Sequence, residues 1–94
     1  MKVFNIELTN WKKANSCFYY RSNNKGAKVI SLFNSCYYNV FTVYFVDQIS
    51  YVKKYMKLSE NEAGGKIIKS ANFDEAKQYV DEFLIRISKL KTFI

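Results

Sequence analysis

The sequence predicts an α+β fold, in which a four- or five-stranded antiparallel sheet carries one long C-terminal helix on one of its faces. Three observations lead to this fold class. Aromatic and β-branched residues dominate the first half of the chain, and these residues suit a pleated, half-buried surface. Polar segments divide that half into short runs that are typical of strands. The last quarter instead repeats apolar residues at the spacing of an amphipathic helix.

Length and composition favour a single domain over residues 1–94. Hydrophobic residues make up 49% of the chain, whereas disordered chains have low hydrophobicity. A chain of this size buries about 60–65% of its unfolded surface, which supports one core but not two. The sequence contains no repeat, low-complexity segment or long linker that would divide it.

Four strands are predicted within residues 3–58, each of them a run of apolar, aromatic or alternating residues. In chain order they cover residues 3–8, 16–21, 28–33 and 37–46. The first has a clear period of two, with Phe4, Ile6 and Leu8 on one face. The polar segment after the second strand ends in Gly26, which can take a positive φ. It therefore predicts a hairpin between the second and third strands.

The segment at residues 48–58 fits two structures. Ile49, Val52 and Met56 share one side of a helix, whereas every second residue from residue 50 onward suits a frayed strand. We favour the strand and keep the helical turn as the alternative. Residues 66–69 are interpreted either as a short strand or as the approach to the helix.

The C-terminal helix, over residues 73–90, is the clearest element of the sequence. Asn72 is a suitable N-cap, and Glu75 lies three residues later, as in a capping box. Basic residues near the end of the segment match the helix dipole. Apolar residues recur at helical spacing over about four turns. They are Ala76, Tyr79, Val80, Phe83, Leu84, Ile87 and Leu90.

The residue types argue against an enzyme, a metal site and a bound cofactor. The chain has no histidine, which removes the commonest general base and most catalytic metal sites. The acidic pairs of the helix are adjacent in sequence and therefore do not face each other. Cys17 and Cys36 are expected to be two buried thiols, and a disulfide between them stays open as the alternative.

Neither a membrane span nor a signal peptide is predicted. No apolar run approaches the roughly 18 residues that a transmembrane helix needs. The N-terminus lacks a continuous apolar segment and a small-residue cleavage site. We therefore expect a cytoplasmic protein, or one in a host cytoplasm if a phage or another mobile element encodes it.

The net charge of +7 lies entirely in the predicted strand half. Residues 1–58 contain nine Lys or Arg against two acids, whereas residues 59–94 contain six residues of each sign. A basic surface attracts polyanions, and nucleic acid is the most abundant polyanion in a cell. Solubility alone is the competing explanation. Arg21 is the single arginine of the basic half, and lysines are the less specific cations.

The eight tyrosines, eight phenylalanines and one tryptophan cannot all lie in the core. Adjacent residues of a strand point to opposite faces, so Tyr19 faces outward if Phe18 and Tyr20 face the helix. Exposed rings among cations suit stacking on unpaired bases. They also suit a protein interface, or a half-buried sheet whose tyrosine hydroxyls reach water.

The favoured hypothesis is a small, non-enzymatic binding protein that engages nucleic acid, preferentially single-stranded, through its basic and aromatic sheet half. The candidate contact residues combine rings for stacking with cations for phosphates. They are Trp11, Lys12, Lys13, Tyr19, Arg21, Lys25, Lys28, Lys53, Lys54 and Lys57. For Trp11 the alternative role is to close one end of the core.

The second hypothesis, from a different class, is a protein-binding inhibitor or adaptor. Such a protein, encoded by a phage or mobile element, would block a host nuclease or defence complex. The short chain and an exposed tyrosine surface are compatible with this role. An uncovered aromatic sheet face, or the long strand at residues 37–46, also leaves a homodimer open.

Overall fold

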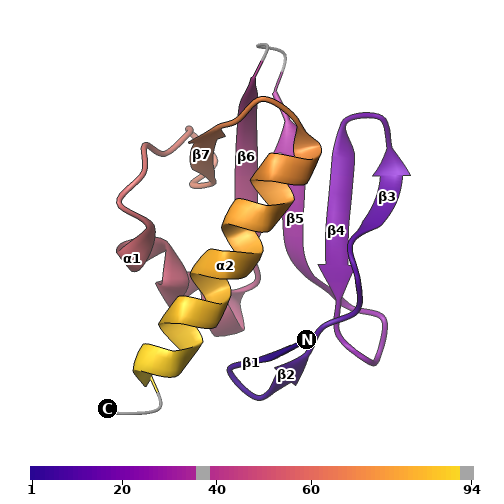
Figure 1. Ribbon diagram of the computed structural model, residues 1–94, viewed down its shortest axis with the longest axis vertical. Helices are drawn as coiled ribbons and strands as arrows, with labels where there is room; N and C mark the ends of the chain where they lie inside the picture. The colour runs from indigo at the N-terminus through magenta and orange to yellow at the C-terminus, as the bar shows by residue number, and fades with distance from the viewer. Residues whose placement is uncertain (36–38, 92–94) are drawn as a thin grey trace.

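The computed structural model describes residues 1–35 and 39–91, the last of these by its backbone alone. The main sheet has five antiparallel strands in the order β3-β4-β5-β6-β7, and the helix α2 (Phe73–Lys91) packs across one face (Figure 1). The strands are β3 (Lys12–Asn15), β4 (Phe18–Ser22), β5 (Lys28–Asn34), β6 (Val40–Phe45) and β7 (Lys66–Lys69). The predicted antiparallel sheet with a C-terminal helix is therefore confirmed.

The sheet is a meander, because each strand from β4 onward pairs with the strand that precedes it. The predicted hairpin joins β4 to β5. Gly26 has a φ of 87° in its turn, and the Asn23 side chain accepts hydrogen bonds from the backbone N–H groups of Lys25 and Ala27. The short strand interpretation of residues 66–69 is also confirmed, since this segment is β7.

The N-terminal segment differs from the prediction. Instead of one strand over residues 3–8, the chain forms a small hairpin of β1 (Lys2–Val3) and β2 (Ile6–Glu7). Phe4 and Asn5 make the turn, with φ values of 51° and 64°. Asparagine tolerates this left-handed region better than most residues, and a period-two pattern does not reveal such a turn. The first strand of the main sheet is β3.

The strand favoured for residues 48–58 is wrong. This segment forms a 3-10 helix, η1 (Asp47–Val52), followed by the single turn α1 (Lys53–Met56). The buried side chains recur at helical spacing and are Ile49, Val52 and Met56. The helical alternative holds because it brings all three apolar side chains to one face, where they reach the core together.

The helix α2 closes the core. The Asn72 side chain accepts a hydrogen bond from the Glu75 N–H, and the Glu75 carboxylate accepts one from the Ala71 N–H, which confirms the predicted cap. Five members of the predicted apolar stripe are buried, namely Ala76, Val80, Phe83, Leu84 and Ile87. The two at its margin are more exposed, Tyr79 at 37% and Leu90 at 56%. No helix in the described part of the chain is long and apolar enough to cross a membrane.

One of the two cysteines, Cys36, belongs to the segment between β5 and β6. Of the strand predicted at residues 37–46, the structure shows Val40–Phe45 as β6, and residues 36–38 lie outside the described residues. Cys17 is exposed and follows β3, so its expected burial is wrong. Cys17 is a free cysteine, so the structure does not show the disulfide predicted as the alternative, and Cys36 lies outside the described residues.

Candidate nucleic-acid interface

Strand alternation gives the main sheet two different faces. The face under α2 contains Ile30, Leu32 and Val43, which are fully buried. The opposite face, here named the outer face, contains the residues between them, such as Ser31 and Phe33. Figure 1 shows α2 in front of the sheet, so the outer face is turned away from the viewer.

Four rings form a continuous surface on the outer face, here named the outer aromatic patch. They are Phe18 and Tyr20 of β4, Phe33 of β5 and Tyr44 of β6. The Phe18 ring stacks on Phe33, with centroids 4.3 Å apart, and on Tyr20, with centroids 5.8 Å apart. Phe33 meets Tyr44 edge to face at 5.6 Å. Phe33 is 37% exposed and the other three rings are half-buried, so the patch presents an aromatic surface to solvent.

Cross-strand pairing aligns the outer face into two rows, each with one residue from β4, β5 and β6. The first row is Tyr20, Ser31 and Tyr44, and the second is Phe18, Phe33 and Thr42. Side chains in such pairs stabilise the sheet through their mutual contact. Rings thus occupy four of the six positions, and two short hydroxyl side chains occupy the others.

Lys28 and Lys12 add positive charge beside the rings of β4. The Nζ of Lys28 lies 4.9 Å from the centroid of the Tyr20 ring and 5.3 Å from that of Phe18, which is within cation–π range. Lys12 pairs with Tyr20 across β3 and β4, so it lies on the outer face next to that ring. Both lysines are exposed and can reach a phosphate group.

A β-bulge brings Lys28 to this face. Arg21 pairs with Ile30, but the next residue, Ser22, pairs with Lys28, so β5 contains the extra residue Val29. Val29 is buried in the core, as is Ile30. In a regular strand of this sequence, strict alternation would place Lys28 on the same face as Ile30, under the helix. The bulge therefore places Lys28 on the outer face, beside the outer aromatic patch.

Tyr44 closes the β6 side of the patch and is held by the loop that precedes β7. Its ring lies beside Gly65, where an added Cβ would come within 2.6 Å of the ring. Its hydroxyl accepts a hydrogen bond from Asn61 Nδ2 at 2.8 Å. The same loop carries the acidic residues Glu60 and Glu62, whereas Lys69 of β7 is exposed at an outer-face position, so this side of the sheet carries charges of both signs.

Tyr19, one of the predicted contact residues, lies on the core face and not on the outer face. Its ring contacts Phe73 of α2 with centroids 4.5 Å apart, and Lys77 Nζ lies 4.5 Å from its centroid. The prediction places Phe18 and Tyr20 under the helix and Tyr19 outside. The structure shows the reverse, with Tyr19 facing the helix and Phe18 and Tyr20 facing outward.

Arg21 and Trp11, also predicted as contact residues, are engaged within the fold. Arg21 is 4% exposed, and it donates to Asp81 Oδ1 at 2.6 Å and to the Thr9 carbonyl oxygen at 2.7 Å. Trp11 Nε1 donates to the same carboxylate at 3.0 Å, and the Arg21 guanidinium lies 5.7 Å from the Trp11 ring. Because Asp81 belongs to α2, these contacts fasten the sheet to the helix. They agree with the alternative role considered for Trp11, which is to close one end of the core.

The other predicted lysines are spread around the molecule. Lys13 pairs with Tyr19, so it is exposed on the edge strand β3 at the core-face position. Lys53 and Lys54 belong to α1, and Lys57 is the left-handed residue that ends it. These three belong to the helical segment and not to the sheet, and among the described residues Lys28 is the lysine with a cation–π contact to the outer aromatic patch.

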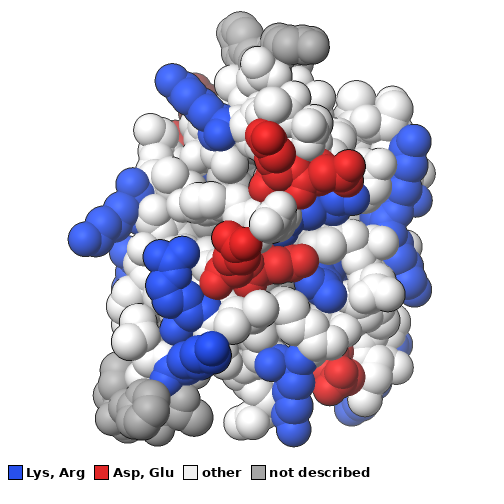
Figure 2. Space-filling view, viewed as in Figure 1, with Lys and Arg blue, Asp and Glu red and all other residues white. Residues whose placement is uncertain are grey.

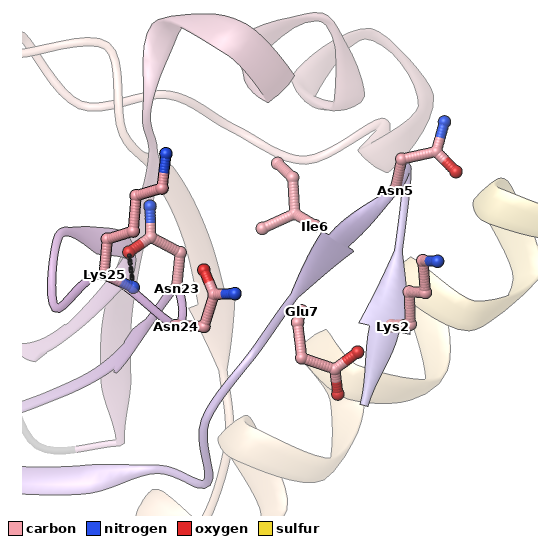
Figure 3. A pocket seen from close by; sticks show the side chains of 7 residues that line it. All are labelled: Lys2, Asn5, Ile6, Glu7, Asn23, Asn24 and Lys25. Atoms are coloured by element: carbon pink, nitrogen blue, oxygen red, sulfur yellow. Dashed lines mark hydrogen bonds between the residues drawn. The ribbon is translucent and has the colours of Figure 1, made fainter.

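Lys25 lines a polar cavity between the β4–β5 turn and the N-terminal hairpin (Figure 3). The cavity has a volume of about 380 Å³. Its lining residues are Lys2, Asn5, Ile6, Glu7, Asn23, Asn24 and Lys25. The carboxylate of Glu7 offsets part of the positive charge of Lys2 and Lys25. The Asn23 side chain already accepts hydrogen bonds from backbone N–H groups of the turn. The cavity therefore extends the polar surface without forming a strong anion site.

The face that carries α2 has the opposite character. Figure 2 shows acidic side chains gathered in the middle of this face, with lysines and arginines around them. The helix contributes Asp74, Glu75, Asp81 and Glu82. The exposed Asp74 forms an ion pair of 3.1 Å with the half-buried Lys77. The acids of α2 are balanced by an equal number of Lys and Arg side chains on the same helix, so this face offers a phosphate group no excess of positive charge, and the outer face is the better candidate for a polyanion.

Sequence reasoning missed all four residues of the outer aromatic patch. For β5 and β6 a signal was present, because the strongly apolar Leu32 and Val43 mark the core face and leave Phe33 and Tyr44 outside. For β4 the signal was misleading, because a charged residue such as Arg21 normally marks the solvent face.

In the described ranges, no group of three or more Cys, Asp or Glu side chains could hold a metal ion. Comparison with protein-family models, with curated proteins and with solved structures finds no match to this chain. Its function is therefore inferred from the geometry and charge of the outer face.

Proposed function

We propose that this chain is a small, non-enzymatic protein that binds single-stranded nucleic acid through the outer aromatic patch. The observation that carries the proposal is the coincidence of four contiguous rings and two adjoining lysines on the sheet face opposite α2. We expect the protein to act in the cytoplasm, where single-stranded nucleic acid is abundant. Of the contact residues predicted from sequence alone, this proposal keeps Lys12 and Lys28 and adds the four rings of the outer aromatic patch.

The rings supply the base contacts. An unpaired base exposes both of its faces and can stack on an aromatic side chain, which contributes about 1–3 kcal/mol per base. Phe33 is the most exposed ring of the patch; Phe18 stacks on one of its faces and Tyr44 meets it edge to face. Rings that already contact one another lose little conformational freedom on binding. Bases in a duplex are stacked and paired already, so the patch favours single strands.

The lysines supply the phosphate contacts. Lys28 and Lys12 lie on the β4 side of the rings, and each phosphate that a lysine neutralises releases counterions. Six of the eight acids of the chain belong to α2 or to the loop before β7. We infer that the backbone of the strand follows β3 and β4 while its bases reach toward β5 and β6.

Fluorescence anisotropy with labelled oligonucleotides tests the proposal. DNA and RNA strands of one sequence, about 12 nucleotides long, are compared with the matching duplex at low and physiological salt. We expect a single strand to bind more tightly than the duplex, with an affinity that falls as salt rises. The relative affinities of DNA and RNA identify the preferred sugar. No binding at low salt, or binding that salt does not weaken, overturns the proposal.

A protein partner is the alternative outcome of the same experiment. Aromatic side chains are enriched at protein interfaces, so the outer aromatic patch would also suit one. Absence of oligonucleotide binding, together with a protein retained from nuclease-treated lysate only when Phe33 is intact, favours the inhibitor or adaptor hypothesis.

A further inference from the structure

Ser31 is the smallest side chain in the middle of the outer face. It pairs with Tyr20 on one side and with Tyr44 on the other. Along β5, Phe33 follows on the same face, and the bulge brings Lys28 to this face on the other side. Four long side chains therefore surround one short polar residue.

The Ser31 hydroxyl has no hydrogen-bond partner among the described residues, although the residue is half-buried. A hydroxyl carries one donor and two acceptor positions, and its hydrogen rotates to suit a partner. Polar groups in such surroundings normally find a partner in protein or in water. This one is directed toward solvent between aromatic side chains, where a ligand can supply the partner.

The spacing of the two tyrosines suits one planar group. Neighbouring strands lie about 4.8 Å apart, so Tyr20 and Tyr44, two strands from each other, are separated by about 9.6 Å at their backbones. A flat ring in contact with both side chains needs about 7 Å between them, since carbon atoms in contact lie about 3.5 Å apart. The two tyrosine rings do not contact each other among the described residues.

We propose that Ser31 is the base-reading position of the outer face. One unpaired base lies above Ser31 between Tyr20 and Tyr44, its two faces contact these two side chains, and the polar edge of the base exchanges a hydrogen bond with Ser31 Oγ. The phosphate of the same nucleotide pairs with Lys28 Nζ, which lies 4.9 Å from the Tyr20 ring. This inference rests on the proposed function and adds a preference among bases to it.

A serine can discriminate between bases only through its single hydroxyl. Stacking is tolerant of sequence because every base has a flat face, whereas a hydrogen bond depends on the edge that the base presents. A neutral hydrogen bond of this kind changes affinity by about 3- to 10-fold. The wild-type protein should therefore show a modest preference among homopolymers.

The test compares three variants against homopolymers of thymine, adenine and cytosine, each about 12 nucleotides long. Ser31→Ala and Ser31→Cys remove the hydroxyl with little change of volume, whereas Ser31→Thr keeps it. We expect Ala and Cys to reduce the ratio between the best and the poorest homopolymer by about 3- to 10-fold. Thr should keep the ratio. The salt dependence should be unchanged in all three, and circular dichroism checks that each variant is folded.

The outcomes separate this inference from the proposed function. If the wild type binds strands and loses none of its preference in Ser31→Ala and Ser31→Cys, the base-reading role is wrong and the binding function stands. If both variants weaken all homopolymers equally, Ser31 is only structural and the inference also fails. If the wild type binds no strand at low salt, both the inference and the proposed function are overturned.

Discussion

Tyr19 and Tyr20 are neighbours in β4, yet they belong to two different surfaces of the molecule. Tyr19 lies under α2 against Phe73, whereas Tyr20 lies on the outer face with Lys28 over its ring. Both faces of this strand thus combine an aromatic ring with a cation. The difference lies in what the rest of the chain supplies to each face.

On the core face the cation has a fixed anion. Arg21 is buried, and α2 brings Asp81 to 2.6 Å from it, with Trp11 on the same carboxylate. On the outer face Lys28 contacts rings and has no acidic partner among the described residues. The comparison teaches that the core face uses its charges for stability, while the outer face keeps its charges available for a ligand.

The largest effect is expected from Asp81→Ala. This change leaves the buried Arg21 guanidinium and the Trp11 N–H without their shared acceptor, and loss of one partner of a buried pair costs about 3 kcal/mol. Urea denaturation followed by circular dichroism measures the fall in the free energy of unfolding. Asp74→Ala is the matched control, because Asp74 is 91% exposed and its ion pair contributes less than about 1 kcal/mol. Equal losses in the two variants would contradict this account of Arg21.

The next effect separates the two faces directly. Phe33→Ala should weaken binding of single strands by about 10- to 100-fold, which corresponds to the loss of one stacked base. Tyr19→Ala should instead lower the free energy of unfolding by about 2 kcal/mol and leave the affinity of the folded protein unchanged. Tyr55→Ala, at an exposed ring of α1, is the control for removing an aromatic side chain. Equal binding by the Phe33 and Tyr55 variants would remove the basis for the outer aromatic patch.

A smaller effect is expected in the salt dependence of binding. Lys28→Gln removes one phosphate contact, so the slope of log affinity against log salt should become shallower by about 0.7. Lys54→Gln carries the same change of charge on α1 and should leave the slope almost unchanged. Titrations at several salt concentrations measure both slopes. If the two variants change it by the same amount, binding depends on net charge and not on the position of Lys28.

The smallest effect concerns Glu60 in the loop that supports Tyr44. A hydrogen bond and the charge of Lys66, 2.9 Å away, hold the pKa of Glu60 below its ordinary value of 4.5. A carboxyl whose pKa is lowered by folding stabilises the protein above its unfolded-state pKa, and this contribution is lost as pH falls through the folded-state pKa. Glu60→Gln should therefore cause a small fall in Tm at pH 7. Thermal melts should show this difference vanishing in acid, and a difference that grows in acid would contradict the assignment.

Parts of the fold could be predicted because their signals are local. The cap formed by Asn72 and Glu75 and the turn at Gly26 depend on residues close in sequence, and both are confirmed. The N-terminal hairpin could not be predicted, because two residues with positive φ interrupt a clear alternation. Residues 48–58 satisfied both periods, and burial against the core selected the helical one.

The sequence by itself determined the antiparallel sheet, the amphipathic helix, and the requirement that adjacent aromatic residues such as Tyr19 and Tyr20 face opposite ways. It could not determine which of the two faces outward. That choice depends on strand register, on the extra residue Val29 in β5, and on the arrival of Asp81, sixty positions after Arg21 in the chain, to neutralise a buried cation. Only the tertiary structure brings these distant groups together. It therefore decided which rings remain accessible to a ligand.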